Sequence, residues 1–473
     1  MRVRLALVVV ATLLTLSSIA AWYASGSAFY AGTNPAMASS SSSALVGQVT
    51  IGLEMSLTGP LGPIGQQVLW GAQLAASQIN SQGGIYLANG PNGPGNYTIN
   101  LVWLDDQSNP ADGPTATTTL ITNYHAAILI TTPASVVAVA DIPVIQQYVE
   151  PSIFLCSTPL ATRTQNLMNF DPSKYMIFHY QPTGIQYGEW AAEFLHDYAS
   201  QISPSGVVKV VYIGQNTEYG QDYFWGFNYT IYQNGWQNQI QIIDVEWYPF
   251  GNTQFQSILS KVASESPNAL VLGTWPSEQA ALSEQAASVP ALKGVVMGPA
   301  TGIVDDKSYY SIGQDAAGTF ITTSYPEYAW TSNSTINAKW AAFRSAYLAL
   351  SGQQPGLLGA SGYDAVWIAA YALEQAGTTQ NTAVINALAT MPPPPQLIAL
   401  MRPTSSGTLF NSYHEVNFQP LELETFWDPT SNSIYTQVVW PSQFATASPQ
   451  FNIFPSVSAS SSRSTTDVGV PVS

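Results

Sequence analysis

The chain has 473 residues, of which 46% are hydrophobic and only 8% are charged, whereas soluble proteins carry about 25% charged residues. Twenty-eight acidic residues against 12 basic ones give a formal net charge of −16, which argues against nucleic-acid binding because phosphate contacts depend on clustered Lys and Arg. A single cysteine, Cys156, excludes an internal disulfide and a cysteine-rich zinc site. Because neutral polar groups do not change charge between acid and neutral pH, we hypothesise that the protein faces an acid exterior.

The N-terminal region is typical of an exported protein. Arg2 and Arg4 precede a long apolar run without charge, which predicts a signal peptide or an N-terminal membrane anchor over residues 1–32. Residues 33–47 are expected to form a Ser-rich linker, and the small residues that end at Ala38 would suit cleavage. We therefore expect the protein at the extracellular face of the cell membrane, either tethered by this segment or secreted after its cleavage.

Three Asn-X-Ser/Thr triplets are candidate glycosylation sites on an exported surface, at Asn96, Asn228 and Asn333. At the other end of the chain, residues 451–473 are rich in Ser and Thr. This composition predicts a disordered tail.

Short apolar runs alternate with amphipathic stretches of helical length, which is typical of βαβ units and a parallel sheet. In chain order, the first series predicts strands at 49–55, 99–106, 126–132 and 152–158, with helices at 66–80, 111–124 and 136–149. The second series predicts helix 188–199, strand 207–214, helix 219–235, strand 240–248, helix 255–267 and strand 268–275. Two such series predict two doubly wound α/β lobes, in which ligands bind at the carboxyl ends of the strands.

The loop at 56–65, SLTGPLGPIG, follows the first predicted strand and so lies at such a carboxyl end. Its Gly residues let the backbone approach a ligand closely, but neither a P-loop nor a dinucleotide-binding pattern occurs in the chain. The four histidines are far apart, and the HExxH and GxSxG motifs are missing from the sequence. We therefore expect neither an enzyme nor a bound metal or other cofactor.

A series of segments carries a resemblance to a known family. The chain resembles the leucine/isoleucine/valine-binding protein family, the type I extracellular solute-binding proteins of branched-chain amino acid ABC transporters, over roughly residues 48–440. The segments that carry the resemblance, in chain order, are VTIGLEMSLTGPLGPIGQQVLWGAQLAASQINSQGGI, INLVWLDDQSNP, IFLCSTPLAT, VVYIGQNTEYGQD, ALVLGTWPSEQAALSEQA, VVMGPATG and SGYDAVWIAAYAL.

The resemblance implies the type I periplasmic-binding-protein fold, with two doubly wound α/β lobes joined by three hinge crossovers. The crossovers would lie near Gln181, Gly298 and Pro403. Lobe 1 would then consist of 48–180 plus 298–402, and lobe 2 of 181–297 plus 403–450.

The resemblance also implies a ligand site in the cleft between the lobes. The loop at 56–65 would form a wall of this cleft, with amide groups that suit the carboxylate of a bound amino acid. Glu278 would pair with the ammonium group, although a Glu in the first turn of a helix also suits the helix dipole. The positions that match the family's ligand-binding residues, together with an aromatic wall at Trp275, are Ser135, Ser157, Thr158, Tyr219, Trp275 and Glu278.

The function that the resemblance implies is capture of a branched-chain or other hydrophobic amino acid and its delivery to an ABC permease. The expected partners are the small-molecule ligand and the permease subunits in the membrane, and the protein itself is expected to be a monomer. Two alternatives stay open, namely an ABC receptor for urea or a short amide and the ligand-binding domain of a sensory protein.

Overall fold

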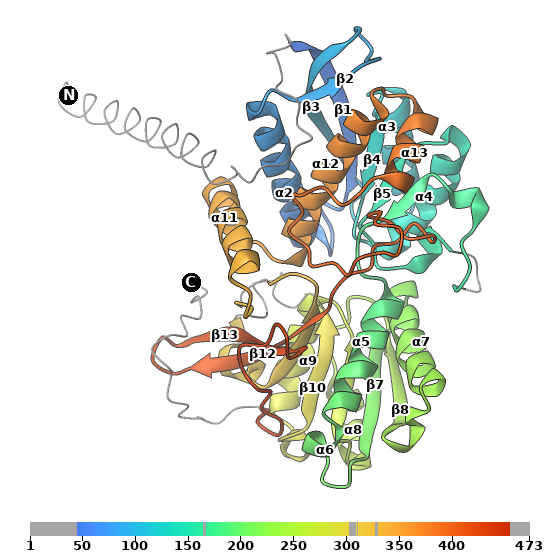
Figure 1. Ribbon diagram of the computed structural model, residues 1–473. Helices are drawn as coiled ribbons and strands as arrows, with labels where there is room; N and C mark the ends of the chain where they lie inside the picture. Colours follow the sequence, from blue (N-terminus) through green and yellow to red (C-terminus); the bar gives the residue numbers. More distant parts are fainter. Residues whose placement is uncertain (1–44, 164–166, 302–308, 310, 327–329, 455–473) are drawn as a thin grey trace, which may run out of the picture. The chain divides into compact units, whose positions relative to one another are not determined.

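The computed structural model describes residues 45–163, 167–301, 309, 311–326 and 330–454. Figure 1 shows two sheets, each with helices packed beside it. The predicted N-terminal segment and nearly all of the predicted linker and tail lie outside the described residues.

The first sheet has six strands in the order β2-β3-β1-β4-β5-β6, and all of them except the antiparallel edge strand β2 run parallel to their neighbours. Helices cover both of its faces, which explains why β4 and the second half of β1 are buried without alternation. Its strands are β1 (Leu45–Met55), β2 (Ile85–Leu87), β3 (Gly95–Asp105), β4 (Ile128–Thr131), β5 (Ser152–Phe154) and β6 (Ile177–His179).

The helices of this first lobe follow from the order of its strands. One crossover leads outward from β1 to β3 and the next leads back across β1 to β4. Since crossovers are right-handed, the two connecting helices lie on opposite faces of the sheet. The helices of the lobe are α2 (Gly62–Ser81), α3 (Gly113–Thr122), α4 (Ser135–Tyr148), α11 (Ser334–Ser351), α12 (Leu357–Ala376) and α13 (Asn381–Thr390).

Glycines allow α2 and α12 to pack closely. A side chain at Gly71 would collide with the carbonyl oxygen of Gly359, and one at Gly362 would collide with that of Val68. The two helix backbones therefore touch directly, and this contact fixes α12 over the first sheet.

The second sheet has seven strands in the order β13-β12-β11-β10-β9-β7-β8, with a parallel part that is completed by the antiparallel strands β12 and β13. Its strands are β7 (Val208–Gln215), β8 (Ile240–Tyr248), β9 (Ala269–Gly273), β10 (Val296–Thr301), β11 (Thr319–Thr323), β12 (Leu421–Asp428) and β13 (Ser433–Trp440).

The helices of this second lobe are α5 (Gly184–Asp197), α6 (Ala199–Ile202), α7 (Glu218–Gln233), α8 (Gln256–Glu265) and α9 (Pro276–Ala287). Short 3-10 helices cover Pro159–Ala161, Pro172–Lys174, Trp236–Asn238, Pro290–Leu292 and Gly313–Ala316.

The lobe boundaries differ from those that the resemblance implied. Strands β10 and β11 pair inside the second sheet, so the chain returns to the first lobe after β11 and not near Gly298. The segment around His414 pairs with β6, because His179 donates its backbone N–H to the carbonyl of His414 at 2.8 Å. The last crossing therefore lies just before β12 and not near Pro403, whereas the first lies between β6 and α5, close to Gln181.

Two side chains of α12 hold the three connections between the lobes. The buried Asp364 carboxylate accepts hydrogen bonds from the hydroxyl of Tyr180 in the first connection at 2.8 Å, and from the backbone N–H groups of Ile398 and Ala399 near the last. Ser361 donates to the side chain of Gln181 at 3.0 Å, and its Oγ lies 3.4 Å from the hydroxyl of Tyr325 in the second connection. Helix α12 is thus bonded directly to the first two crossings and, through residues 398–399, to the segment whose Leu400 carbonyl accepts the N–H of Gln419 beside the last crossing.

Replacing Asp364 should destabilise the protein strongly. Asp364→Ala leaves two buried N–H groups and a buried hydroxyl without an acceptor, which should lower the free energy of unfolding by roughly 3 kcal/mol or more. Asp364→Asn keeps one acceptor oxygen and should cost less. Chemical denaturation would measure the free energy of unfolding of both Asp364 variants, with the exposed Gln375→Ala on the same helix as a control. If Asp364→Ala were as stable as this control, the proposed role of Asp364 would be contradicted.

Candidate ligand-binding site

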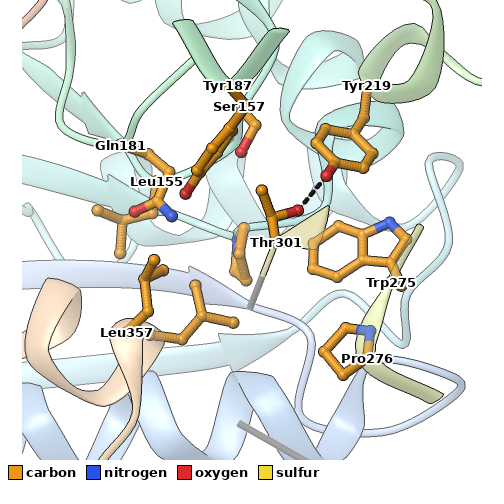
Figure 2. A pocket seen from close by; sticks show the side chains of 11 residues that line it. Leu155, Ser157, Gln181, Tyr187, Tyr219, Trp275, Pro276, Thr301 and Leu357 are labelled. Atoms are coloured by element: carbon orange, nitrogen blue, oxygen red, sulfur yellow. Dashed lines mark hydrogen bonds between the residues drawn. The ribbon is translucent and has the colours of Figure 1, made fainter. Parts of the chain in front are cut away.

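A small cavity, part of it open to solvent, lies where carboxyl-end segments of both sheets meet α12 (Figure 2). The first lobe contributes the β4–α4 loop, the end of β5 and the start of α12, and the second lobe contributes α5, α7, the β9–α9 turn and the end of β10. The lining residues are Pro133, Leu155, Ser157, Gln181, Tyr187, Tyr219, Trp275, Pro276, Thr301, Leu357 and Leu358.

Aromatic side chains of the second lobe form one wall of the cavity. The rings of Tyr219 and Trp275 lie 5.8 Å apart between centroids, and the hydroxyl of Tyr219 is hydrogen-bonded to that of Thr301 (Figure 2). Burial raises the pKa of Tyr219, so this hydroxyl stays protonated. The wall therefore offers ring faces and neutral hydroxyl groups to a ligand.

Gln181 reaches the cavity from the first connection between the lobes. Its Oε1 accepts a hydrogen bond from Ser361, which fixes the plane of the amide, and Figure 2 shows the amide beside the cavity. The side chain is only 4% exposed. A ligand that bonds to its Nε2 would therefore meet a donor that is already held in place.

The lining of the cavity carries no formal charge. Among the described residues that form it, none is an Asp, Glu, Lys, Arg or His. Polar recognition in this cavity therefore rests on hydroxyl groups, one amide and backbone groups.

Three of the residues that the sequence nominated line the cavity, namely Ser157, Tyr219 and Trp275. Two others lie outside its lining. Ser135 begins α4, where its buried Oγ meets no hydrogen-bonding partner in the described part of the chain. Thr158 is fully buried and donates its hydroxyl to Asp222 at 2.9 Å.

Glu278 also lies outside the lining, and its carboxylate is occupied by groups of the protein. It accepts hydrogen bonds from the backbone N–H groups of Gly251 at 2.7 Å and Trp275 at 3.1 Å, from the hydroxyl of Tyr248 at 2.9 Å, and from the amide of Gln215. Burial raises its pKa in spite of these bonds. In this geometry, Glu278 positions the turn that carries Trp275.

The loop at 56–65 bonds mainly to its own lobe. The N–H groups of Leu57 and Thr58 donate to Asp105 at 2.9 and 3.1 Å, and the N–H of Leu61 donates to the hydroxyl of Ser108 at 3.1 Å. These amide groups are therefore taken, and the expectation that amides of this loop await a ligand carboxylate is wrong for these three.

Sequence reasoning missed the lining residues Gln181, Tyr187 and Thr301. Thr301 ends strand β10, so a strand-end rule would have found it if the strand had been assigned. The other two depend on how the first connection and α5 approach the cavity, which no local pattern reveals.

The three glycosylation candidates occupy different settings. Asn96 is half-buried in β3 and Asn228 is half-buried in α7. Asn333 is exposed and caps α11, where its Oδ1 accepts from the N–H groups of Thr335 and Ile336. Glycosylation at each of them stays a prediction.

Neither a metal-binding group nor a membrane-spanning helix is found among the residues that the structure describes. No group of three or more His, Cys, Asp and Glu side chains in this part of the chain could hold a metal ion. Among the same residues, no helix combines the length and apolar character that crossing a membrane requires.

Residues 48–406 match the family described as periplasmic binding protein, and the chain belongs to this family. The family consists of solute-binding receptors of the periplasm or the extracellular space. A curated relative, the Leu/Ile/Val-binding protein BraC3 of Rhizobium johnstonii, is 24% identical over 280 residues, which are 58% of this chain and 67% of the relative.

Solved structures share the fold. The branched-chain amino acid transporter substrate-binding protein LivJ of Streptococcus pneumoniae, in complex with isoleucine, gives a TM-score of 0.63 at 19% identity over 83% of this chain and 100% of that chain. A solute-binding protein of an ABC transporter from R. palustris, in complex with benzoate, gives a TM-score of 0.61 at 20% identity over 80% of this chain and 93% of that chain. These matches confirm the predicted type I periplasmic-binding-protein fold.

Substitution of Glu278 should separate its two possible roles. Because its carboxylate joins four internal donors, Glu278→Ala should lower the free energy of unfolding by roughly 2 to 4 kcal/mol. If Glu278 only paired with the ammonium group of a ligand, the alanine variant would instead bind an amino acid about 10- to 100-fold more weakly, and its free energy of unfolding would be unchanged. Chemical denaturation would decide, with the exposed Glu284→Gln on the same helix as a control.

Proposed function

We propose that this protein is the extracellular receptor of an ABC transporter, and that it captures a small hydrophobic solute between its lobes and delivers it to the permease. The observation that carries the proposal is the cavity in which both lobes supply lining residues, within a fold of the periplasmic binding protein family. A ligand that touches both lobes stabilises their closed arrangement by its differential affinity. The permease would then recognise the loaded form, and the receptor itself would do no chemistry.

A branched-chain or other hydrophobic amino acid is the first candidate ligand. Leu155, Leu357, Leu358 and the aromatic wall suit an apolar side chain, and two similar proteins are named for Leu, Ile and Val or were solved with isoleucine. Ser157, Tyr219 and Trp275 would contact this ligand from the two lobes, and Gln181 and Thr301 would add neutral polar groups.

An uncharged amide or an aromatic solute is the second candidate. The cavity lining provides no carboxylate for an ammonium group, and Glu278 is bonded within the protein. A fixed amide and several hydroxyl groups match the donors and acceptors of a neutral amide equally well, and a ring could lie against Trp275. One of the similar proteins was solved with benzoate.

We expect calorimetric titration of the purified chain to detect one of these solutes without turnover. The probes are L-leucine, L-isoleucine, L-valine, L-phenylalanine, acetamide, urea and benzoate, each at pH 4 and pH 7. Saturable binding of the amino acids would support the first candidate, and binding of amide or benzoate alone would support the second. If protein that is shown to be folded bound none of the seven probes, both candidate ligand classes would be contradicted.

For whichever probe binds, Trp275→Ala should weaken binding by roughly 10- to 100-fold, because about 1.5 to 3 kcal/mol of apolar burial would be lost. The matched control is Trp103→Ala, which removes a tryptophan of β3 that is 42% exposed. If Trp275→Ala and Trp103→Ala bound the probe with equal affinity, the placement of the ligand against Trp275 would be contradicted.

A further inference from the structure

Three carboxyl groups are buried together at the carboxyl ends of the strands in the first lobe. Glu54 belongs to β1, Asp106 follows β3 and Asp141 belongs to α4, and each is 0% exposed. Thr132 and Ser56 link Glu54 to Asp106 by hydrogen bonds, and Asp141 lies close enough to Glu54 for the two carboxyls to act on each other. We call these three residues the carboxyl cluster.

Neutral donors satisfy only part of the cluster. Thr132 donates its N–H to Oε2 of Glu54 at 3.0 Å, and Ser56 donates its hydroxyl to Oδ1 of Asp106 at 2.6 Å. Four oxygens, namely Oε1 of Glu54, Oδ2 of Asp106 and both of Asp141, are buried and make no hydrogen bond of normal geometry among the described residues. The hydroxyl of Thr117 on α3 lies near Asp141 and favours its ionised form, but it is the donor of one neutral group against two carboxylate oxygens. Ionised carboxylates only accept hydrogen bonds, so these oxygens can bond to one another only where a proton is present.

Basic groups are missing from the surroundings of the cluster within the described part of the chain. The groups that act on Glu54 and Asp141 across space are the other carboxyls of the cluster. Cys156 follows β5 and lies within electrostatic range of Asp141, and burial raises the pKa of this thiol to about 12, so it is neutral. Asp105, next to Asp106, points away and binds the loop that follows β1.

Full ionisation of the cluster would therefore place like charges side by side in a buried site without counter-ions. Such repulsion and desolvation both favour the protonated acid. Burial raises the pKa of Glu54 well above its ordinary range and that of Asp141 to about 7.

We propose that Glu54 and Asp141, buried beside Asp106, take up protons in acid and bond through them within the carboxyl cluster, which stabilises the first lobe most at acid pH and weakens it as Glu54 and Asp141 ionise. The cluster also reaches the wall of the cavity. Thr132, which donates to Glu54, also pairs its hydroxyl with that of Ser56 at 2.8 Å, and the next residue, Pro133, lines the cavity. The carboxyl of Glu54 therefore connects the cluster to the β4–α4 loop through the N–H of Thr132.

The direction of the pH dependence follows from linkage between proton binding and folding. A carboxyl with a raised pKa in the folded state binds its proton more tightly than it does in the unfolded chain. The stability that Asp141 contributes is complete below its ordinary pKa of 3.8 and is lost as the pH rises through about 7. Glu54 acts in the same direction.

The test is chemical unfolding of the full chain between pH 3 and pH 8, with the variants Glu54→Gln and Asp141→Asn. In each variant an amide supplies N–H donors where the acid needs a proton. In the unaltered protein, the unfolding equilibrium constant should rise with pH between about 4 and 7. In each variant the unfolding equilibrium constant should rise less steeply with pH. For each proton that the folded state no longer binds, its increase per pH unit should be smaller by a factor of up to about ten.

The exposed Glu284→Gln is the matched control, and its slope should equal that of the unaltered protein. Equal slopes in the control and in both cluster variants would overturn the proposal. Infrared spectroscopy of the folded protein at pH 6 adds a second readout, since the carbonyl stretch of protonated carboxyl groups should be weaker in Glu54→Gln than in the control. If neither variant folds, the unaltered protein must release protons when it unfolds in weakly buffered solution at pH 6, and no release would contradict the cluster.

Discussion

The attachment of all three lobe connections to helix α12 is the constraint on which the candidate site depends. Asp364 bonds the first connection and residues 398–399, which lie beside the last one because Gln419 donates its N–H to the carbonyl of Leu400, and Ser361 bonds the first while its Oγ lies near the second. These contacts bring the carboxyl ends of both sheets to one cavity, and Leu357 and Leu358 of the same helix line it. Since Ser361 also bonds Gln181, the connections between the lobes and the candidate site depend on the same side chains.

The fold could be predicted from the sequence because its signals are local. Continuous apolar strands such as β4 and β9 alternate with amphipathic helices, and ligand sites in such sheets lie at strand ends. The family resemblance led to Ser157 and Tyr219, and the place of Trp275 near a strand end led to that residue; all three line the cavity. The lobe boundaries could not be read in this way, because β11 and β12 are far apart in the chain and pair only in the folded protein.

The position of Glu278 shows a second limit of sequence reasoning. Its place in the first turn of α9 fits both a ligand-pairing residue and a residue that binds the turn before the helix. The choice depends on donors from other elements, such as Tyr248 and Gly251, which approach only in the folded protein. Family resemblance transfers a position, but the hydrogen-bonding partners decide what the side chain at that position is free to do.

The shortage of basic residues connects the protein's composition with its interior. With 12 Lys and Arg for 28 Asp and Glu, most carboxyl groups that become buried cannot be paired with a cation. Glu150 and Glu424 show the same pattern as the carboxyl cluster, because burial raises the pKa of each to about 8 while only an amide or a backbone N–H bonds to it. Such groups cost least in acid, where they are neutral, and the uncharged lining of the cavity would recognise a solute in the same way across this range of pH. A surface of neutral polar groups, buried carboxyls with raised pKa values and an uncharged candidate cavity are therefore three results of one composition.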